Sequence, residues 1–220
     1  EHTLGMMLML AHKLDVYHKQ QWQGEWQRIG NANDVVMELD GKTLLVVGLG
    51  GIGRQVAKRA HALGMQVIAT RRSRREGPEY VTYVGLSDEL MELAKKADVV
   101  VNVTPLTPST KGLFDRKFFQ AMKPTAYFIN IGRGKSVITE DLLAALDNGE
   151  IAGAGLDVTD PEPLPQEHPL WRTPNVIITP HSSSPSDRMT QRFWTLVREN
   201  LRRYNLGEPM LNVADIKRGY

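Results

Sequence analysis

Hydrophobic positions along the chain follow two alternating patterns. Runs that are apolar almost throughout, such as TLLVV at 43–47 and DVVVNV at 98–103, are separated by longer segments in which apolar residues recur at helical spacing. Short continuous apolar runs are typical of strands buried on both faces, as in a parallel sheet covered by helices. The sequence therefore predicts an α/β fold built on a doubly wound parallel sheet.

The same patterns place the individual elements. We expect strands at 43–47, 65–70, 80–84, 98–103, 126–131, 152–158 and 175–179. We expect helices at 1–19, 52–63, 87–96, 115–122, 139–148 and 186–204. Residues 20–40 are polar without a clear period and are expected to form an extended arm or loop. The two tryptophans of this arm, if exposed, suggest a contact with a second subunit, and packing within the chain is the alternative. Proline-rich loops at 104–112 and 159–174 follow strands directly, where α/β sheets bind ligands.

Composition narrows the class of protein. Hydrophobic residues make up 41% of the chain and charged residues 24%, which are ordinary values for a globular protein. The apolar stretch 4–10 is about half as long as a membrane span, so we expect no contact with a membrane. A net charge of +2 is too small to predict nucleic acid as a partner. The chain has no cysteine, and we expect a cytoplasmic protein without a metal site.

A glycine-rich turn lies between the first strand and the helix after it. Gly48, Gly50 and Gly53 form a GxGxxG element, with Gly51 and Ile52 at the start of the helix. The first glycine permits a tight bend, the second lets a pyrophosphate approach the backbone, and the third lets helix and strand pack closely. The helix N-terminus then faces the phosphates. The sequence predicts a dinucleotide site here, with a plain glycine-rich turn as the alternative.

The end of the next strand bears on which dinucleotide binds. Proteins that select NAD usually carry an acidic residue there, which holds the ribose hydroxyls. In this chain the strand runs into Arg71, Arg72 and Ser73, followed by Arg74 and Arg75, with no carboxylate. Guanidinium groups suit a phosphate on the adenosine ribose, so we expect NADP(H) to be preferred over NAD(H). The alternatives are a solvated loop, or a basic patch for an acidic partner or nucleic acid.

Six blocks of sequence carry a family resemblance. They are EHTLGMMLMLAHKL, VGLGGIGR, VNVTPLTPSTKGLF, FINIGRGKSV, GAGLDVTDPEPLP and ITPHSSS, in this order. Together they resemble the D-isomer-specific 2-hydroxyacid dehydrogenases, a family that includes glyoxylate/hydroxypyruvate reductases, phosphoglycerate dehydrogenase, formate dehydrogenase and the C-terminal-binding-protein corepressors. The likeness covers nearly the whole chain, and six ordered blocks are far more specific than any one of them.

The resemblance implies three catalytic residues. Arg133 takes the place of the arginine that holds the substrate carboxylate and carbonyl, a task that a planar guanidinium suits. His181 takes the place of the histidine that gives a proton to the new alkoxide in reduction and accepts it back in oxidation. Glu162 resembles the carboxylate that orients this ring. A surface charge is the plain alternative for Arg133 and Glu162, and the other histidines lack a comparable context.

The resemblance also implies further coenzyme contacts. Asp157 resembles the residue that binds the nicotinamide carboxamide. Other positions border the coenzyme in the family: Thr104, Pro105, Thr110, Ile131 and Gly132, beside Arg133 and His181. Threonine and proline in a loop need no ligand to explain them. Serines at 182–184 replace an alanine-glycine pair often seen after the family's histidine, which is a departure from the pattern.

The resemblance implies how the chain divides. We expect an NAD(P)-binding domain at 1–185, in which 1–19 is the helix that links two domains in the family and 20–40 is a dimer arm. Residues 186–220 are the expected C-terminal helix and tail, which in the family return to a substrate domain. Most of that domain precedes the linking helix in the family. If this chain is the whole polypeptide, we expect it to bind coenzyme with weak or absent turnover, because a cleft with one wall orients substrate poorly.

Two functions are compared. The first is an oxidoreductase that transfers a hydride between NADP(H) and a small D-2-hydroxy or 2-oxo acid of glyoxylate or hydroxypyruvate type, working as a homodimer like many family members. The second is a dinucleotide-sensing, corepressor-like dimerisation module with little catalysis. Replacing His181 separates them, because the change abolishes reduction and leaves a sensor intact.

Overall fold

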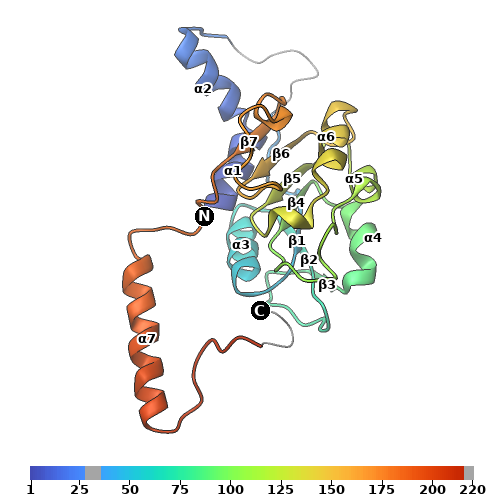
Figure 1. Cartoon of the computed structure of the whole chain (residues 1–220). Coiled ribbons are helices and arrows are strands. Elements are labelled where there is room, and N and C mark those ends of the chain that lie inside the picture. The colour runs from blue at the N-terminus through green and yellow to red at the C-terminus, as the bar shows by residue number, and fades with distance from the viewer. Residues whose placement is uncertain (28–35, 216–220) are drawn as a thin grey trace. The chain divides into compact units, whose positions relative to one another are not determined.

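The fold is organised around one parallel sheet. The structure is a computed structural model that describes residues 1–27 and 36–215, and its sheet has seven strands in the order β3-β2-β1-β4-β5-β6-β7 (Figure 1). All neighbouring strands run parallel, so the predicted doubly wound α/β fold is confirmed. The strands are β1 Thr43–Val47, β2 Gln66–Thr70, β3 Tyr83–Gly85, β4 Val99–Asn102, β5 Tyr127–Asn130, β6 Gly153–Leu156 and β7 Val176–Ile178.

Helices cover both faces of the sheet. In Figure 1, α1 and α3 lie on one side, and α4, α5 and α6 lie on the other. Strand residues alternate between the two cores: Leu44 and Val46 of β1 pack with the first group, and Leu45 and Val47 with the second. The helices are α1 His2–Ala11, α2 Leu14–Gln23, α3 Gly51–Ala62, η1 Ser87–Glu89, α4 Leu90–Ala94, α5 Arg116–Ala121, η2 Gly134–Ser136, α6 Thr139–Asp147, η3 Pro169–Trp171 and α7 Met189–Asn205.

The prediction of a single first helix over 1–19 is wrong. α1 ends at Ala11, and Lys13 has a left-handed backbone with φ of +56°, after which α2 runs on to Gln23. The buried stripe stops where α1 stops, because Leu14 is already 48% exposed. The arm predicted at 20–40 therefore begins as helix, and its residues 28–35 lie outside the described part of the chain.

The described chain divides into two compact units. The first is Glu1–Ser183, which contains the whole sheet, and the second is Ser184–Tyr220. In the second unit, α7 is tied to the turn after it, since Arg202 pairs with both Glu199 and Glu208. Among the helices that the structure describes, none has the length and apolar content needed to cross a bilayer.

Strand order places a switch point of the sheet between β1 and β4. The chain passes from β1 outward to β2 and β3, then returns to place β4 on the other side of β1, and such a reversal is where open α/β sheets bind ligands. The turn after β1 lies against the chain leaving β4: a Cβ on Gly48 would be 3.2 Å from the Val103 carbonyl oxygen. Gly48 also has φ of +102°, a conformation that favours glycine.

Gly53 is a glycine of this turn whose replacement should be costly. A Cβ there would lie 2.2 Å from the Gly48 carbonyl oxygen, so Gly53→Ala must push α3 away from β1. We expect the free energy of unfolding in urea to fall by about 1–3 kcal/mol, the usual cost of overpacking. Gly51→Ala is the matched control, since a Cβ at Gly51 meets nothing within 4 Å. Equal stability of the two variants would contradict this account of the packing.

Candidate active site

The glycine turn leaves an open space in front of α3. A Cβ on Gly50 or Gly51 would meet no atom within 4 Å, and the Ile52 side chain is 63% exposed. The first amide groups of a helix have no partner within it, and they carry a partial positive charge. A bare backbone and unpaired amides at a sheet's switch point fit the pyrophosphate of a dinucleotide.

The arginine loop at 71–77 begins where β2 ends. The Arg71 guanidinium donates to the Glu76 carbonyl oxygen at 2.9 Å, and Arg75 is paired with Glu89 at 2.7 Å. The side chains of Arg72 and Ser73 are exposed, and within the described residues they have no hydrogen bond or ion pair. Of Arg71 and Arg72, which begin the loop, Arg72 is therefore the one whose guanidinium has no hydrogen bond or ion pair within the described residues.

A buried network of amide side chains joins the carboxyl ends of β4 and β5. Asn102 and Asn130 are register partners in the sheet and are fully buried. The Asn102 amide nitrogen donates to the Asn130 side-chain oxygen at 2.9 Å and to the Ser136 hydroxyl at 2.8 Å. The Asn102 oxygen accepts from the Thr104 amide at 3.0 Å and from its hydroxyl at 2.7 Å.

The same network fixes the segment that carries Arg133. The Asn130 oxygen accepts from the Gly132 amide at 3.0 Å, and the Arg133 carbonyl oxygen accepts from Asn130 at 3.2 Å and Ser136 at 2.6 Å. Arg133 itself is exposed at the strand end. Sequence reasoning missed Asn102, Asn130 and Ser136, although an asparagine that closes an otherwise apolar strand was a usable signal.

The loop after β6 packs directly on the Arg133 segment. A Cβ on Gly134 would be 1.8 Å from the Thr159 carbonyl oxygen, so the two backbones are in contact. The Thr139 hydroxyl donates to the Asp160 carbonyl oxygen at 2.7 Å and adds a hydrogen bond to this contact. The loop that holds Glu162 is therefore fixed against the loop that holds Arg133.

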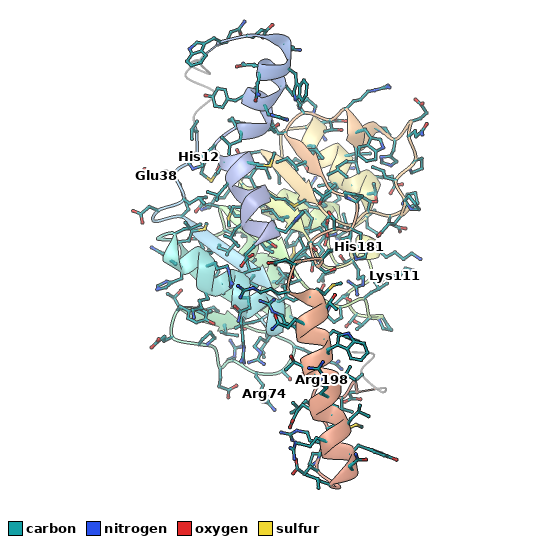
Figure 2. The ribbon with its side chains drawn as sticks, turned by 90° about the vertical axis from the view of Figure 1, so that its left-hand side faces the viewer. His12, Glu38, Arg74, Lys111, His181 and Arg198 are labelled. Atoms are coloured by element: carbon teal, nitrogen blue, oxygen red, sulfur yellow. The ribbon has the colours of Figure 1, made fainter. Side chains whose placement is uncertain are left out.

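His181 and Glu162 form a pair. The His181 Nδ1 lies 2.5 Å from Glu162 Oε1, and the two side chains are 48% and 40% exposed. His181 lies in the loop after β7, labelled in Figure 2, and its backbone is left-handed with φ of +51°. Within the described residues its Nε2 has no hydrogen bond, so that nitrogen is available to a substrate.

Asp157, at the end of β6, holds the histidine loop in place. Its side-chain oxygens accept from the Thr179 hydroxyl at 2.6 Å and from the amides of Ser182 at 2.8 Å and Ser183 at 3.0 Å. Its carbonyl oxygen accepts from the His181 amide at 2.8 Å. Burial alone would raise the pKa of the Asp157 carboxyl, but the hydrogen bonds from Ser183, Thr179 and Ser182 together lower it.

The first helix reaches the same anchor. His2 Nε2 lies 2.9 Å from the Thr179 hydroxyl, which in turn donates to Asp157. Nothing in the sequence gives His2 a functional context or connects it with this loop. The contact spans 177 positions of the chain, so no local pattern could reveal it.

The structure thus brings Glu162 to His181, and it brings the loop that holds Glu162 to the Arg133 segment. Some predicted coenzyme contacts have other partners here: the Thr110 hydroxyl donates to the Pro105 carbonyl oxygen at 2.6 Å, and Thr104 is tied to Asn102. The Asp157 side chain is wholly buried and serves the histidine loop. Direct coenzyme contacts of the predicted positions therefore stay predictions.

The arrangement defines a class of protein. A glycine turn at the switch point, a guanidinium after β5 and an imidazole–carboxylate pair after β6 and β7 all stand at one edge of the sheet, as in a nicotinamide-dependent dehydrogenase. Residues 4–183 match the D-isomer specific 2-hydroxyacid dehydrogenase family, NAD binding domain. The chain belongs to this family, and the resemblance expected from the sequence is confirmed.

Individual relatives are similar over the whole chain. A glyoxylate/hydroxypyruvate reductase A from Photorhabdus laumondii is 34% identical over 222 residues, covering 100% of this chain and 68% of that protein. A probable 2-hydroxyacid dehydrogenase from Rhizobium etli, solved with NADP, HEPES and L(+)-tartaric acid, is 32% identical with a TM-score of 0.86, covering 99% of this chain and 67% of that one. An NADPH-dependent glyoxylate/hydroxypyruvate reductase from Sinorhizobium meliloti, solved with NADP and sulfate, is 30% identical with a TM-score of 0.86 and the same coverage.

The lowered pKa of Asp157 predicts how the free energy of unfolding depends on pH. In the folded protein the pKa of the Asp157 carboxyl lies below its ordinary value of 3.8. The ionised carboxylate therefore stabilises the fold fully at pH values above 3.8, and this stabilisation is lost as pH falls through the folded-state pKa. Asp157→Asn should lower the free energy of unfolding at neutral pH by about 1–3 kcal/mol and flatten its decline in acid. Denaturant unfolding at several pH values measures both. Asp147→Asn, at an exposed position of α6, should leave the curve unchanged, and parallel curves for wild type and Asp157→Asn would contradict the prediction.

Proposed function

We propose that this chain is the coenzyme-binding and catalytic part of an NADP(H)-dependent reductase of small 2-oxo acids, of the glyoxylate or hydroxypyruvate kind. One observation supports the proposal most directly. His181 is paired with Glu162, and the loop that holds Glu162 packs against the Arg133 segment, at the sheet edge that also holds the glycine turn. The reductases named above, which share the family and fold, support the substrate class.

The residues divide the reaction among them. Bound NADPH supplies a hydride to the carbonyl carbon of the substrate. Arg133 binds the carboxylate and carbonyl oxygens and stabilises the negative charge that grows on the carbonyl oxygen. His181 gives that oxygen the proton from Nε2, so that the 2-oxo acid, the hydride and the proton together form the 2-hydroxy acid. Glu162 accepts from Nδ1, which sets the tautomer and the direction of the ring.

The loop after β2 is proposed to determine which coenzyme binds more tightly. Arg72 and Ser73 are exposed and uncommitted, and that strand end has no carboxylate for ribose hydroxyls. The Rhizobium and Sinorhizobium structures contain NADP, which supports NADP(H) as the preferred coenzyme, with NAD(H) second. The predicted backbone and loop contacts remain part of this proposal: Gly48, Gly50, Gly51, Ile52, Gly53, Arg71, Thr104, Pro105, Thr110, Ile131, Gly132 and Asp157.

We further propose that the chain works as a homodimer through its N-terminal arm. Trp22, at the end of α2, is 81% exposed, and Trp26, just beyond this helix, is 96% exposed and lines a groove together with Tyr17. Large apolar side chains grouped in this way are typical of protein contacts. A cytoplasmic location and the absence of nucleic acid as a partner stay predictions from the sequence.

Coenzyme titration tests the specificity loop. We expect NADPH to bind more tightly than NADH, and Arg72→Ala to raise the NADPH dissociation constant about tenfold, because one charge-assisted contact with the ribose phosphate is lost. Affinity for NADH should stay within about twofold of wild type. Arg59→Ala, at an arginine of α3 that is bonded to Gln55, serves as control. Equal wild-type affinity for the two coenzymes would reject the assignment.

Turnover of a histidine variant separates an enzyme from a sensing module. His181→Gln should lower the rate of NADPH oxidation with glyoxylate or hydroxypyruvate by about 100-fold or more, since the proton donor is gone, while NADPH binding stays intact. His168→Gln is the control, because His168 only caps η3 through the Leu170 amide. Full turnover by His181→Gln would reject His181 as the proton donor, whereas wild type that binds NADPH without turning over either substrate would favour the corepressor-like alternative.

The subunit contact has its own test. Replacing Trp22 and Trp26 together by serine removes apolar area from the arm, and we expect the protein to sediment as a monomer at concentrations where wild type is a dimer. The free energy of unfolding of the sheet unit in the monomer should change little, because both side chains are exposed. A wild-type monomer, or an unchanged dimer in the variant, would count against the arm as the interface.

A further inference from the structure

Glu89 joins three segments beside the arginine loop. Its Oε1 accepts from the Arg75 guanidinium at 2.7 Å and from the Leu86 amide at 2.9 Å, and its Oε2 accepts from the Tyr83 hydroxyl. The Tyr83 oxygen in turn accepts from Arg75 at 3.3 Å. Arg75, Tyr83 and Glu89 therefore form a closed triangle of hydrogen bonds, which we call the Glu89 latch.

The latch fixes one end of the loop and leaves its middle open. At the start of the loop, the Arg71 amide donates to the Gly85 carbonyl oxygen at 3.0 Å, in continuation of the β2–β3 pairing. Four residues later, Arg75 is drawn onto Glu89. Between these anchors the side chains of Arg72, Ser73 and Arg74 are exposed, and Figure 2 shows Arg74 pointing out of the unit, apart from His181.

We propose that Glu89 is a specificity-determining positioning residue, which holds the loop in the conformation that presents Arg72 and Ser73 to a phosphate on the adenosine ribose. The inference rests on the proposed preference for NADP(H). In this proposal Arg75 has a structural role in the loop, because the charge of its guanidinium is already matched by the Glu89 carboxylate. Recognition of the phosphate then falls to the arginines between the anchors.

The number of donors distinguishes this latch from an ordinary surface pair. A single exposed ion pair contributes little to stability, because solvent screens it and long side chains lose freedom. Here donors from β3, from the turn after it and from the arginine loop converge on one carboxylate. Hydrogen bonds from Arg75, Leu86 and Tyr83 lower the pKa of Glu89 to about 2, so the latch stays charged throughout the neutral range.

A loop that is ordered before the coenzyme arrives improves selectivity. Ordering flexible side chains on binding lowers affinity, so a loop already held in place binds the phosphate more tightly. NADH has no phosphate at that position and gains nothing from the ordered arginines. The latch should therefore affect the two coenzymes unequally, and a general loss of structure would not produce that difference.

Paired titrations of latch variants test the proposal. Glu89→Gln keeps the shape and removes the charge, and Tyr83→Phe removes one donor. For Glu89→Gln we expect the NADPH dissociation constant to rise about three- to tenfold and that for NADH to stay within about twofold, with a smaller change of the same kind for Tyr83→Phe. The control is Glu92→Gln, which breaks a 2.6 Å ion pair with Lys95 close by on α4 but leaves the loop alone.

Amide hydrogen exchange separates this inference from the coenzyme assignment. Residues 72–77 should exchange faster in Glu89→Gln than in wild type or Glu92→Gln, whichever coenzyme the protein prefers. Unchanged exchange there would overturn the latch by itself. Equal weakening of both coenzymes, or tighter NADPH binding because a freed Arg75 reaches the phosphate, would overturn its role in specificity. If exchange responds as expected but wild type binds both coenzymes equally, the NADP(H) preference fails together with that role.

Discussion

The close approach of the glycine turn to the chain leaving β4 is the contact on which the site depends. Gly48 leaves no room for a side chain beside the Val103 carbonyl oxygen, and Gly53 leaves none beside Gly48. These two contacts let α3 pack closely on β1 at the switch point of the sheet. Because all strands run parallel, the loops after β5, β6 and β7 leave from the same edge, and their side chains share one face with the turn.

Buried polar groups make that edge rigid. Asn102 and Asn130 would be costly in an apolar sheet if their amides were unpaired, but each is satisfied by the other or by the loop it supports. Asp157 does the same for the histidine loop with three accepted hydrogen bonds. Side chains at the strand ends thus hold the loops in place, and the side chains proposed to react project from a fixed backbone.

Local patterns were enough to predict the fold and much of the candidate site. Apolar runs located the strands, and the glycine spacing located the turn, because both depend on neighbours in sequence. The break at Lys13 was missed, since a left-handed residue there reflects how α1 ends and α2 begins and leaves no periodic trace. The Asn102–Asn130 pair spans 28 positions and the Arg75–Tyr83 contact 8, and both require knowledge of strand order or loop path that a single sequence does not provide.

Strand order also sets apart two tasks. The loop proposed to recognise the adenosine end of the coenzyme follows β2, whereas the groups proposed for proton transfer and substrate binding follow β5, β6 and β7, with β1 and β4 between. Substitutions around the arginine loop therefore leave the asparagine anchors and the histidine loop untouched. A descendant of this protein, or an engineer, has a route for exchanging one coenzyme for the other in small steps without rebuilding the machinery that acts on the carbonyl group.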